Sequence, residues 1–84
     1  MNWVLHIRNK TKKEFCRFPM KDRCYIAEAL REIKENPFFG DIIKLDVENF
    51  WRRRIGAYRI FYEIITSKKI VYVFRIERRN SKTY

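Results

Sequence analysis

The residues best suited to chemistry are arginines, and they gather in one short stretch of the chain. Arg52, Arg53 and Arg54 are consecutive, and Arg59 follows after a turn at Gly56. A guanidinium forms bidentate hydrogen bonds with phosphate and can stabilise the extra negative charge of a pentacoordinate phosphorane. It is a poor proton acceptor, because its pKa lies far above neutral pH. The cluster therefore predicts phosphate binding more directly than phosphate cleavage.

Side chains elsewhere give little support to other catalytic mechanisms. His6 is the only histidine, so a zinc site lacks ligands and a nucleophile–histidine pair lacks a well-placed base. Cys16 and Cys24 form no CxxC pair, and as reduced thiols they are typical of a cytoplasmic protein. A paired-carboxylate mechanism has only isolated acids, such as Asp46 and Glu63, to draw on. We expect no metal and no cofactor.

The net charge narrows the class of partner. Twenty Lys and Arg against ten Asp and Glu leave +10 on 84 residues, which we expect to form one domain, residues 1–84. Such a charge favours polyanions, and RNA or DNA comes before a membrane because no run is apolar enough to span a bilayer. The alternative is a basic protein whose charge has no specific partner.

Aromatic residues interleave with the arginines. Nucleobases stack on such rings in single-stranded RNA sites, although on strands core packing is the commoner use. Tyr84, beyond the last expected strand, has no evident packing role. The aromatic residues concerned are Phe50, Trp51, Tyr58, Phe61, Tyr62, Tyr72, Phe74 and Tyr84.

Hydrophobic periodicity places the arginines on a sheet. Alternation predicts strands at residues 3–8, 48–55, 58–65 and 69–76, and residues 38–45 are interpreted as a loop with buried anchors. A capping box formed by Thr11 and Glu14 predicts a helix to about Phe18, and apolar spacing predicts a second helix over residues 21–36. The class is α+β, with order β-α-α-β-β-β and a helical hairpin on a mainly antiparallel four-stranded sheet.

Alternation also divides the arginine run between two faces. Arg52 and Arg54 should share one face of their strand, while Arg53 joins the other. The structural alternative for all three is a cationic strand that protects a sheet edge from aggregation.

The hairpin and the tail together resemble a known family. Residues 51–62 contain the whole pattern R-x-G-x-Y-R-[apolar]-x-Y, from Arg54 to Tyr62, and the chain closes with Arg78-Arg79-Asn80-Ser81-Lys82-Thr83-Tyr84. These motifs, the Asn-Pro after the second helix and the order of elements are similar to the RelE/ParE superfamily of toxins from type II toxin-antitoxin systems. The arginine-to-tyrosine tail is typical of the RelE-like branch, the mRNA interferases.

The resemblance implies a RelE-like toxin that enters the ribosomal A site and cleaves mRNA without metal. In that reaction the 2′-hydroxyl attacks the adjacent phosphate, which leaves a cyclic phosphate and a free 5′-hydroxyl. The implied partners are the ribosome, mRNA and a RelB-like antitoxin.

The same resemblance assigns roles to individual residues. Arg59 would hold the scissile phosphate, Arg78 would stabilise the transition state or protonate the leaving oxygen, and Tyr84 would stack on or orient the nucleotide. Arg52 stands where the family often has a lysine near the attacking hydroxyl. The RNA-binding residues expected besides these are Arg54, Arg53, Arg79 and Lys82.

Two departures keep an alternative open. Phe50 replaces a lysine of the best-known members, and the general base of other members has no clear counterpart, with Glu48 and Lys82 as conceivable substitutes. The alternative is a ParE-like gyrase inhibitor or a catalytically weak homologue that acts as a binding module. In the favoured interpretation, folding gathers Arg59, Arg78 and Tyr84 into one shallow trough.

Overall fold

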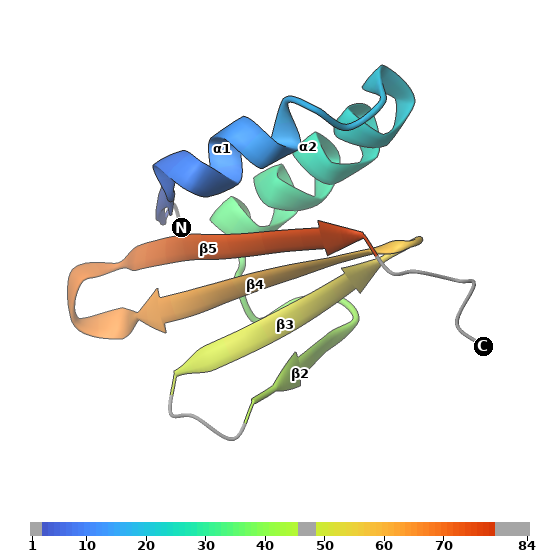
Figure 1. Ribbon diagram of the computed structural model, residues 1–84. Helices are drawn as coiled ribbons and strands as arrows, with labels where there is room; N and C mark the ends of the chain where they lie inside the picture. Colours follow the sequence, from blue (N-terminus) through green and yellow to red (C-terminus); the bar gives the residue numbers. More distant parts are fainter. Residues whose placement is uncertain (1–2, 46–48, 79–84) are drawn as a thin grey trace.

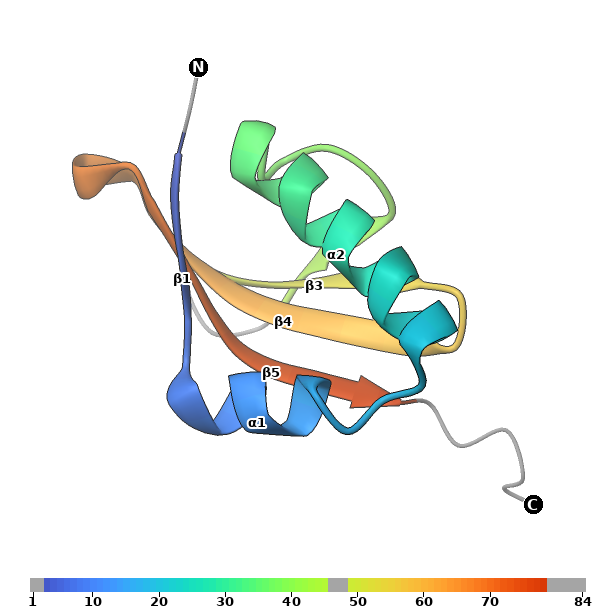
Figure 2. The same ribbon diagram turned by 90° about the horizontal axis from the view of Figure 1, so that it is seen from above.

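The computed structural model describes residues 3–45 and 49–78. The elements follow one another along the chain (Figure 1; β1 is seen in Figure 2): β1 (Val4–Ile7), α1 (Asn9–Phe15), α2 (Met20–Glu35), β2 (Ile42–Lys44), β3 (Phe50–Ile55), β4 (Tyr58–Ile65), a short 3-10 helix (Thr66–Lys68) and β5 (Ile70–Arg78). Both predicted helices and all four predicted strands are present, with ends shifted by a few residues.

The strands form a single five-stranded sheet in the order β1-β5-β4-β3-β2. β1 runs parallel to β5, and the other neighbouring pairs are antiparallel. The predicted α+β class is confirmed, but the sheet has one strand more than expected. The additional strand is β2, which lies in the segment interpreted as a loop and pairs with β3. Its three residues are too few for alternation to be visible in the sequence.

One face of the sheet holds the core, and α2 crosses it (Figure 2). Alternate residues of β4 and β5 point toward this helix, whose apolar residues recur at helical spacing, so the two periods meet at one interface. The buried residues are Ile26, Ala29, Leu30 and Ile33 of α2 with Tyr58, Ile60, Tyr62, Ile64, Val71, Val73 and Ile76 of the strands.

α1 lies alongside β5 (Figure 2), and Thr11 joins the two. Thr11 is buried, and its hydroxyl donates a hydrogen bond of 2.9 Å to the carbonyl of Phe74. The helix begins at Asn9 without a side-chain cap, so Thr11 lies inside its first turn. The predicted capping box of Thr11 and Glu14 was therefore wrong, because the hydroxyl is used for tertiary packing instead.

A β-bulge interrupts the pairing of β4 with β5. Tyr62 pairs with Val73, but the preceding residue, Phe61, pairs with Arg75. Phe74 is thus an extra residue without a partner in β4. A bulge of this kind reverses the inward and outward alternation of the strand beyond it.

The reversal decides which residues of β5 lie on the face away from α2, called the open face below. Arg75 and Glu77 lie on the open face, opposite Phe61 and Arg59 of β4. Ile76 is buried against the helices, at 3% exposure, and Arg78 is on that same side.

Candidate phosphate-binding face

Three of the predicted arginines share the open face. Arg52 and Arg54 come from β3 and Arg59 from β4, with Arg54 directly opposite Arg59 in the register. Directly opposed like charges repel each other, and here each has an acidic neighbour. Arg54 Nε lies 3.1 Å from Asp41, and Arg59 Nη1 lies 3.5 Å from Glu77. The prediction that Arg52 and Arg54 share one face is confirmed.

Aromatic rings lie among these guanidiniums. The ring centre of Phe74 is 5.2 Å from that of Phe50 and 6.3 Å from that of Phe61. The guanidinium carbon of Arg75 lies 5.9 Å from the centre of the Phe61 ring. All three rings are partly buried on the open face, outside the core beneath α2. Cations interleaved with rings are the combination that holds single-stranded nucleic acid.

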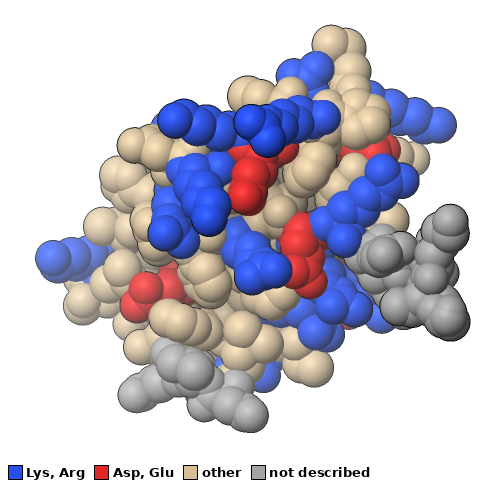
Figure 3. Space-filling view, in the orientation of Figure 1, with Lys and Arg blue, Asp and Glu red and all other residues tan. Residues whose placement is uncertain are grey.

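The open face also has unused hydrogen-bond donors. The Nε atoms of Arg52 and Arg59 are shielded from solvent and find no acceptor among the described residues. A buried N–H without a partner costs about 1–3 kcal/mol, so an anion that accepted these bonds would be favoured. Figure 3 shows Lys and Arg side chains spread widely over the face of the molecule seen there, with acidic side chains set among them.

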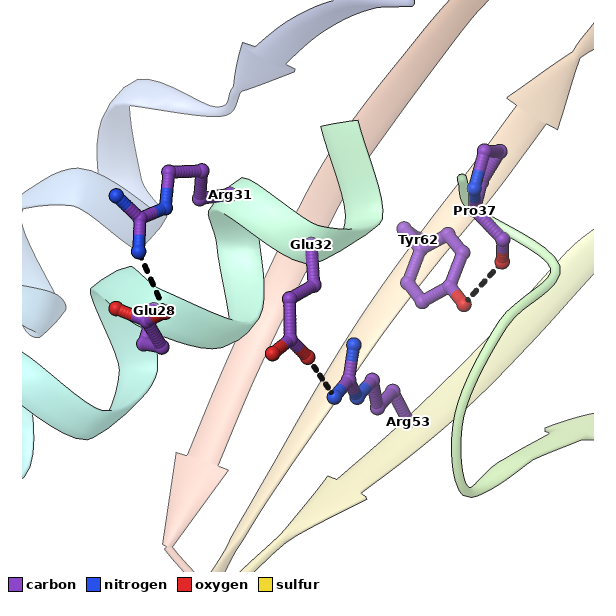
Figure 4. Close-up of polar contacts among 6 residues, drawn as sticks. All are labelled: Glu28, Arg31, Glu32, Pro37, Arg53 and Tyr62. Atoms are coloured by element: carbon purple, nitrogen blue, oxygen red, sulfur yellow. Dashed lines mark hydrogen bonds and ion pairs between the residues drawn. The ribbon is translucent and has the colours of Figure 1, made fainter. Parts of the chain in front are cut away.

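Arg53 lies on the helix-covered face and is only 8% exposed. Its Nη2 donates a hydrogen bond to a carboxylate oxygen of Glu32 in α2 (Figure 4). The prediction that Arg53 binds RNA is corrected here, because strand alternation turns its guanidinium inward onto an acidic partner.

Tyr62 lies close to Arg53 and is buried on the same side of the sheet. Its hydroxyl donates a hydrogen bond of 2.8 Å to the carbonyl of Pro37 (Figure 4). Burial raises the pKa of Tyr62 to about 12, against the opposing effect of the Arg53 guanidinium. On this face the Arg53 guanidinium and the Tyr62 hydroxyl each bond to a partner inside the protein, so we interpret the face as structural.

Arg78 also lies on the helix-covered side. It stands opposite Tyr58 in the register, and its guanidinium carbon is 5.9 Å from the centre of the Tyr58 ring. Burial, helped by the hydrogen bond donated to Asp22, raises the pKa of Tyr58. Arg59 and Arg78 are thus on opposite faces of the sheet, and the expected trough containing both is not formed. The bulge at Phe74 is the physical reason.

A groove between α1 and β5 nevertheless adjoins both faces. Its volume is about 480 Å³, and it is lined by Glu77 of the open face as well as by Glu14 of α1. Five basic residues outnumber these two acids, so the groove extends the positive charge of the open face around the edge of β5 to Arg78. The basic lining residues are Arg8, Lys10, Arg17, Arg75 and Arg78.

The sequence prediction missed two residues of the open face, Arg75 and Glu77. A regular alternation counted along β5 from Val73 turns both toward the helices, and nothing local in the sequence marks the bulge. Three residues expected at the site, Arg79, Lys82 and Tyr84, lie outside the described residues.

Solved structures define the class of fold. The archaeal RelE of the RelE–RelB complex from Pyrococcus horikoshii matches with a TM-score of 0.84 and 21% identity, over 96% of this chain and 99% of that one. RelBE2 from Mycobacterium tuberculosis matches at 0.83 and 17%, over 94% and 100%. The isolated RelE toxin of E. coli matches at 0.83 and 20%, over 95% and 87%. The molecule therefore has the RelE toxin fold.

The family follows from the sequence model that matches residues 7–82, that of the ParE toxin of type II toxin-antitoxin systems, parDE. The chain belongs to this family, and with it to the RelE/ParE superfamily of toxins, as its motifs predicted. A comparison with curated proteins finds no match. Within the part of the chain that the structure describes, neither helix has the length and apolar character needed to cross a bilayer.

Proposed function

We propose that this toxin is a ribosome-dependent endoribonuclease that cleaves mRNA in the A site. The observation that carries the proposal is the open face, where Arg52, Arg54 and Arg59 lie beside aromatic rings. Such a face has the donors for a phosphate chain and the rings for its bases. The reaction we propose is attack of the 2′-hydroxyl on the adjacent phosphate, without metal.

The proposed roles follow from what a guanidinium can do. Arg59 binds the scissile phosphate, and Arg52 and Arg54 contact the backbone on either side of it. Each stabilises the negative charge that grows on the phosphate in the transition state. An RNA strand that leaves the open face past Arg75 would enter the α1–β5 groove and reach Arg78 there. Arg78, on the opposite face from Arg59, therefore stays in the proposal as an RNA contact in this groove and not at the scissile phosphate. Tyr84 stays as a stacking residue, and Arg79 and Lys82 stay as RNA contacts.

The proposed partners are the ribosome, mRNA and a RelB-like antitoxin, in the cytoplasm. The structures of RelE from Pyrococcus horikoshii and Methanococcus jannaschii are those of RelE–RelB complexes, which supports an antitoxin of this type. The net charge of +10 favours an inhibitor that supplies acidic groups.

The test compares Arg59→Ala with Arg31→Ala. Both changes remove one guanidinium, but Arg31 lies on the exposed surface of α2, paired with Glu28 (Figure 4). Purified ribosomes translating a defined mRNA are mixed with each toxin, and cleavage in the A-site codon is measured by primer extension. We expect Arg59→Ala to lose cleavage by about 100-fold or more, on the scale of a transition-state donor. Arg31→Ala should cleave like the unmodified toxin.

Equal cleavage by both variants would contradict the role of Arg59. If the unmodified toxin leaves mRNA intact on translating ribosomes, the ribonuclease proposal itself fails.

A ParE-like gyrase inhibitor is the second candidate. The matching family model is that of ParE, and the separation of Arg59 from Arg78 by the sheet also favours it. A DNA supercoiling assay with purified gyrase separates the two functions. Inhibition of supercoiling together with intact mRNA would establish the second candidate instead of the first.

A further inference from the structure

Among the described residues, Arg59, the proposed contact to the scissile phosphate, is paired with Glu77. Its Oε2 lies 3.5 Å from Nη1 of Arg59, and its Oε1 lies 2.8 Å from Nη2 of Arg75. The Glu77 side chain is 29% exposed, so solvent and a bound strand can both reach it. One carboxylate thus stands between two guanidiniums of the open face.

This position is fixed by the backbone. Glu77 is directly opposite Arg59 in the register of β4 and β5, and cross-strand partners in an antiparallel pair hold their Cβ atoms about 4.5–5.5 Å apart. The bulge at Phe74 turns Glu77 onto this face, since a regular strand would bury it beneath the helices. The same bulge therefore places Glu77 beside Arg59 and puts Arg78 on the opposite face of the sheet.

The two ion pairs of Glu77 are unequal, and the difference suggests how a substrate enters. The contact with Arg75 is a short ion pair of 2.8 Å, whereas the contact with Arg59 is a hydrogen bond at the outer limit of length, 3.5 Å. A phosphate, which offers a bidentate pair of oxygens, can displace the carboxylate from Arg59 while Arg75 still holds it. The displaced carboxylate then lies beside the phosphate, held through its other oxygen.

We propose that Glu77 is a catalytic residue of this toxin, the general base that takes the proton from the attacking 2′-hydroxyl. The inference rests on the ribonuclease function proposed above. As the 2′-oxygen forms its bond to phosphorus, the 2′-proton moves to Glu77, and the bond from phosphorus to the 5′-oxygen breaks. The leaving 5′-oxygen takes a proton from water, and Glu77 returns its proton to solvent, so protons and electrons balance.

Glu77 supplies what the arginines lack. A carboxylate is a chemical group that can accept a proton, whereas a guanidinium is a poor proton acceptor. A positioned general base contributes typically about 10²–10⁴-fold to a rate. The arginines bind and stabilise charge, and the carboxylate between them moves the proton.

The test uses Glu77→Gln with Glu63→Gln as its matched control. Glu63 is a half-buried glutamate of β4 on the same open face, opposite Phe50 and Tyr72. Single-turnover cleavage on ribosomes and affinity for a single-stranded RNA are measured for each. We expect Glu77→Gln to cleave about 100-fold more slowly or worse and yet to bind RNA as tightly as the unmodified toxin or more tightly, since a competing charge is gone. Glu63→Gln should keep its cleavage rate.

Glu77→Asp separates a chemical role from a structural one. It retains a carboxylate on a shorter stem, so it should restore part of the cleavage lost in Glu77→Gln at a similar melting temperature. Equal loss in both variants with a lower melting temperature, or cleavage by Glu77→Gln within threefold of the unmodified toxin, would overturn the inference. The second result leaves the ribonuclease proposal standing, whereas an unmodified toxin that does not cleave removes both.

Discussion

Arg52 and Arg53 are neighbours in the chain that point to opposite faces of β3. The same substitution should therefore change RNA binding at Arg52 but not at Arg53. Arg52→Met should weaken RNA binding and leave the fold intact. Arg53→Met should leave RNA binding unchanged. Its partner, Glu32, provides the matching perturbation of stability, because Glu32→Gln keeps the shape of the side chain and removes its charge.

The size of the Glu32→Gln effect follows from the burial of the pair. The Arg53 side chain is only 10% exposed, and its Nε and Nη1 already lack acceptors among the described residues. Leaving a buried charge without its partner costs about 3–5 kcal/mol. The Glu32 side chain is 42% exposed, so water screens part of the attraction, and we expect about 2 kcal/mol. In a domain of this size, that lowers the melting temperature by about 8–16 °C.

Arg53→Met should be milder than Glu32→Gln. Methionine fills much of the space of the arginine stem without a charge, and the remaining Glu32 carboxylate is exposed enough to be hydrated. We expect a loss of about 1 kcal/mol or less. A larger loss of unfolding free energy for Glu32→Gln than for Arg53→Met is expected when the buried guanidinium stabilises the fold.

The assays are thermal unfolding followed by circular dichroism and binding of a fluorescent single-stranded RNA over a series of salt concentrations. Arg52→Met should reduce the slope of log affinity against log salt by about 0.7, the contribution of one phosphate contact on a single strand. Arg53→Met should keep the slope of the unmodified toxin. A lower slope for Arg53→Met, or a larger stability loss for Arg53→Met than for Glu32→Gln, would refute the assignment of the two faces.

Two further predictions concern the buried Tyr62 and the two glycines with positive φ. The raised pKa of Tyr62, about 12, means that the unfolded chain loses this proton first as the pH rises, so the unfolding free energy should fall between about pH 10 and pH 12, by up to about 1.4 kcal/mol per pH unit. When urea unfolding is measured at pH 9 and pH 11, the unfolding free energy of Tyr62→Phe should fall less between the two pH values than that of the unmodified toxin. An equal fall in both proteins would contradict the prediction. Gly40→Ala should cost about 2 kcal/mol, because φ is +101° and a Cβ would lie 3.1 Å from the Arg53 guanidinium. Gly56→Ala, at φ +56° in open space, should cost only about 1 kcal/mol in the same measurement.

Much of the architecture could be predicted from the sequence, because it depends on local patterns of apolar residues. Alternation in residues 50–65 reports which side chains face the core, and it placed Arg52 and Arg54 together and Arg53 apart. The apolar spacing of α2 likewise gave the helix that covers the sheet. These signals repeat every few residues and need no knowledge of the partner strand.

Very short elements and features that depend on tertiary contacts could not be predicted from the sequence. β2 has three residues, too few to show a period, and Thr11 has the spacing of a cap although its hydroxyl bonds to Phe74, 63 residues away. In each case the local pattern fits two structures equally well. The choice is made by contacts that form only when distant segments pack.

The sequence by itself determined that this chain carries a surplus of guanidinium on a strand hairpin, and it predicted from this an anionic partner. The tertiary structure decided which guanidiniums lie on the same face of the sheet. One extra residue at Phe74 reverses the remainder of β5, which brings Arg75 and Glu77 beside Arg59 and turns Arg78 to the other side. The physical reason is that side-chain direction in a strand has a period of two, so a single unpaired residue exchanges the two faces for every residue that follows it.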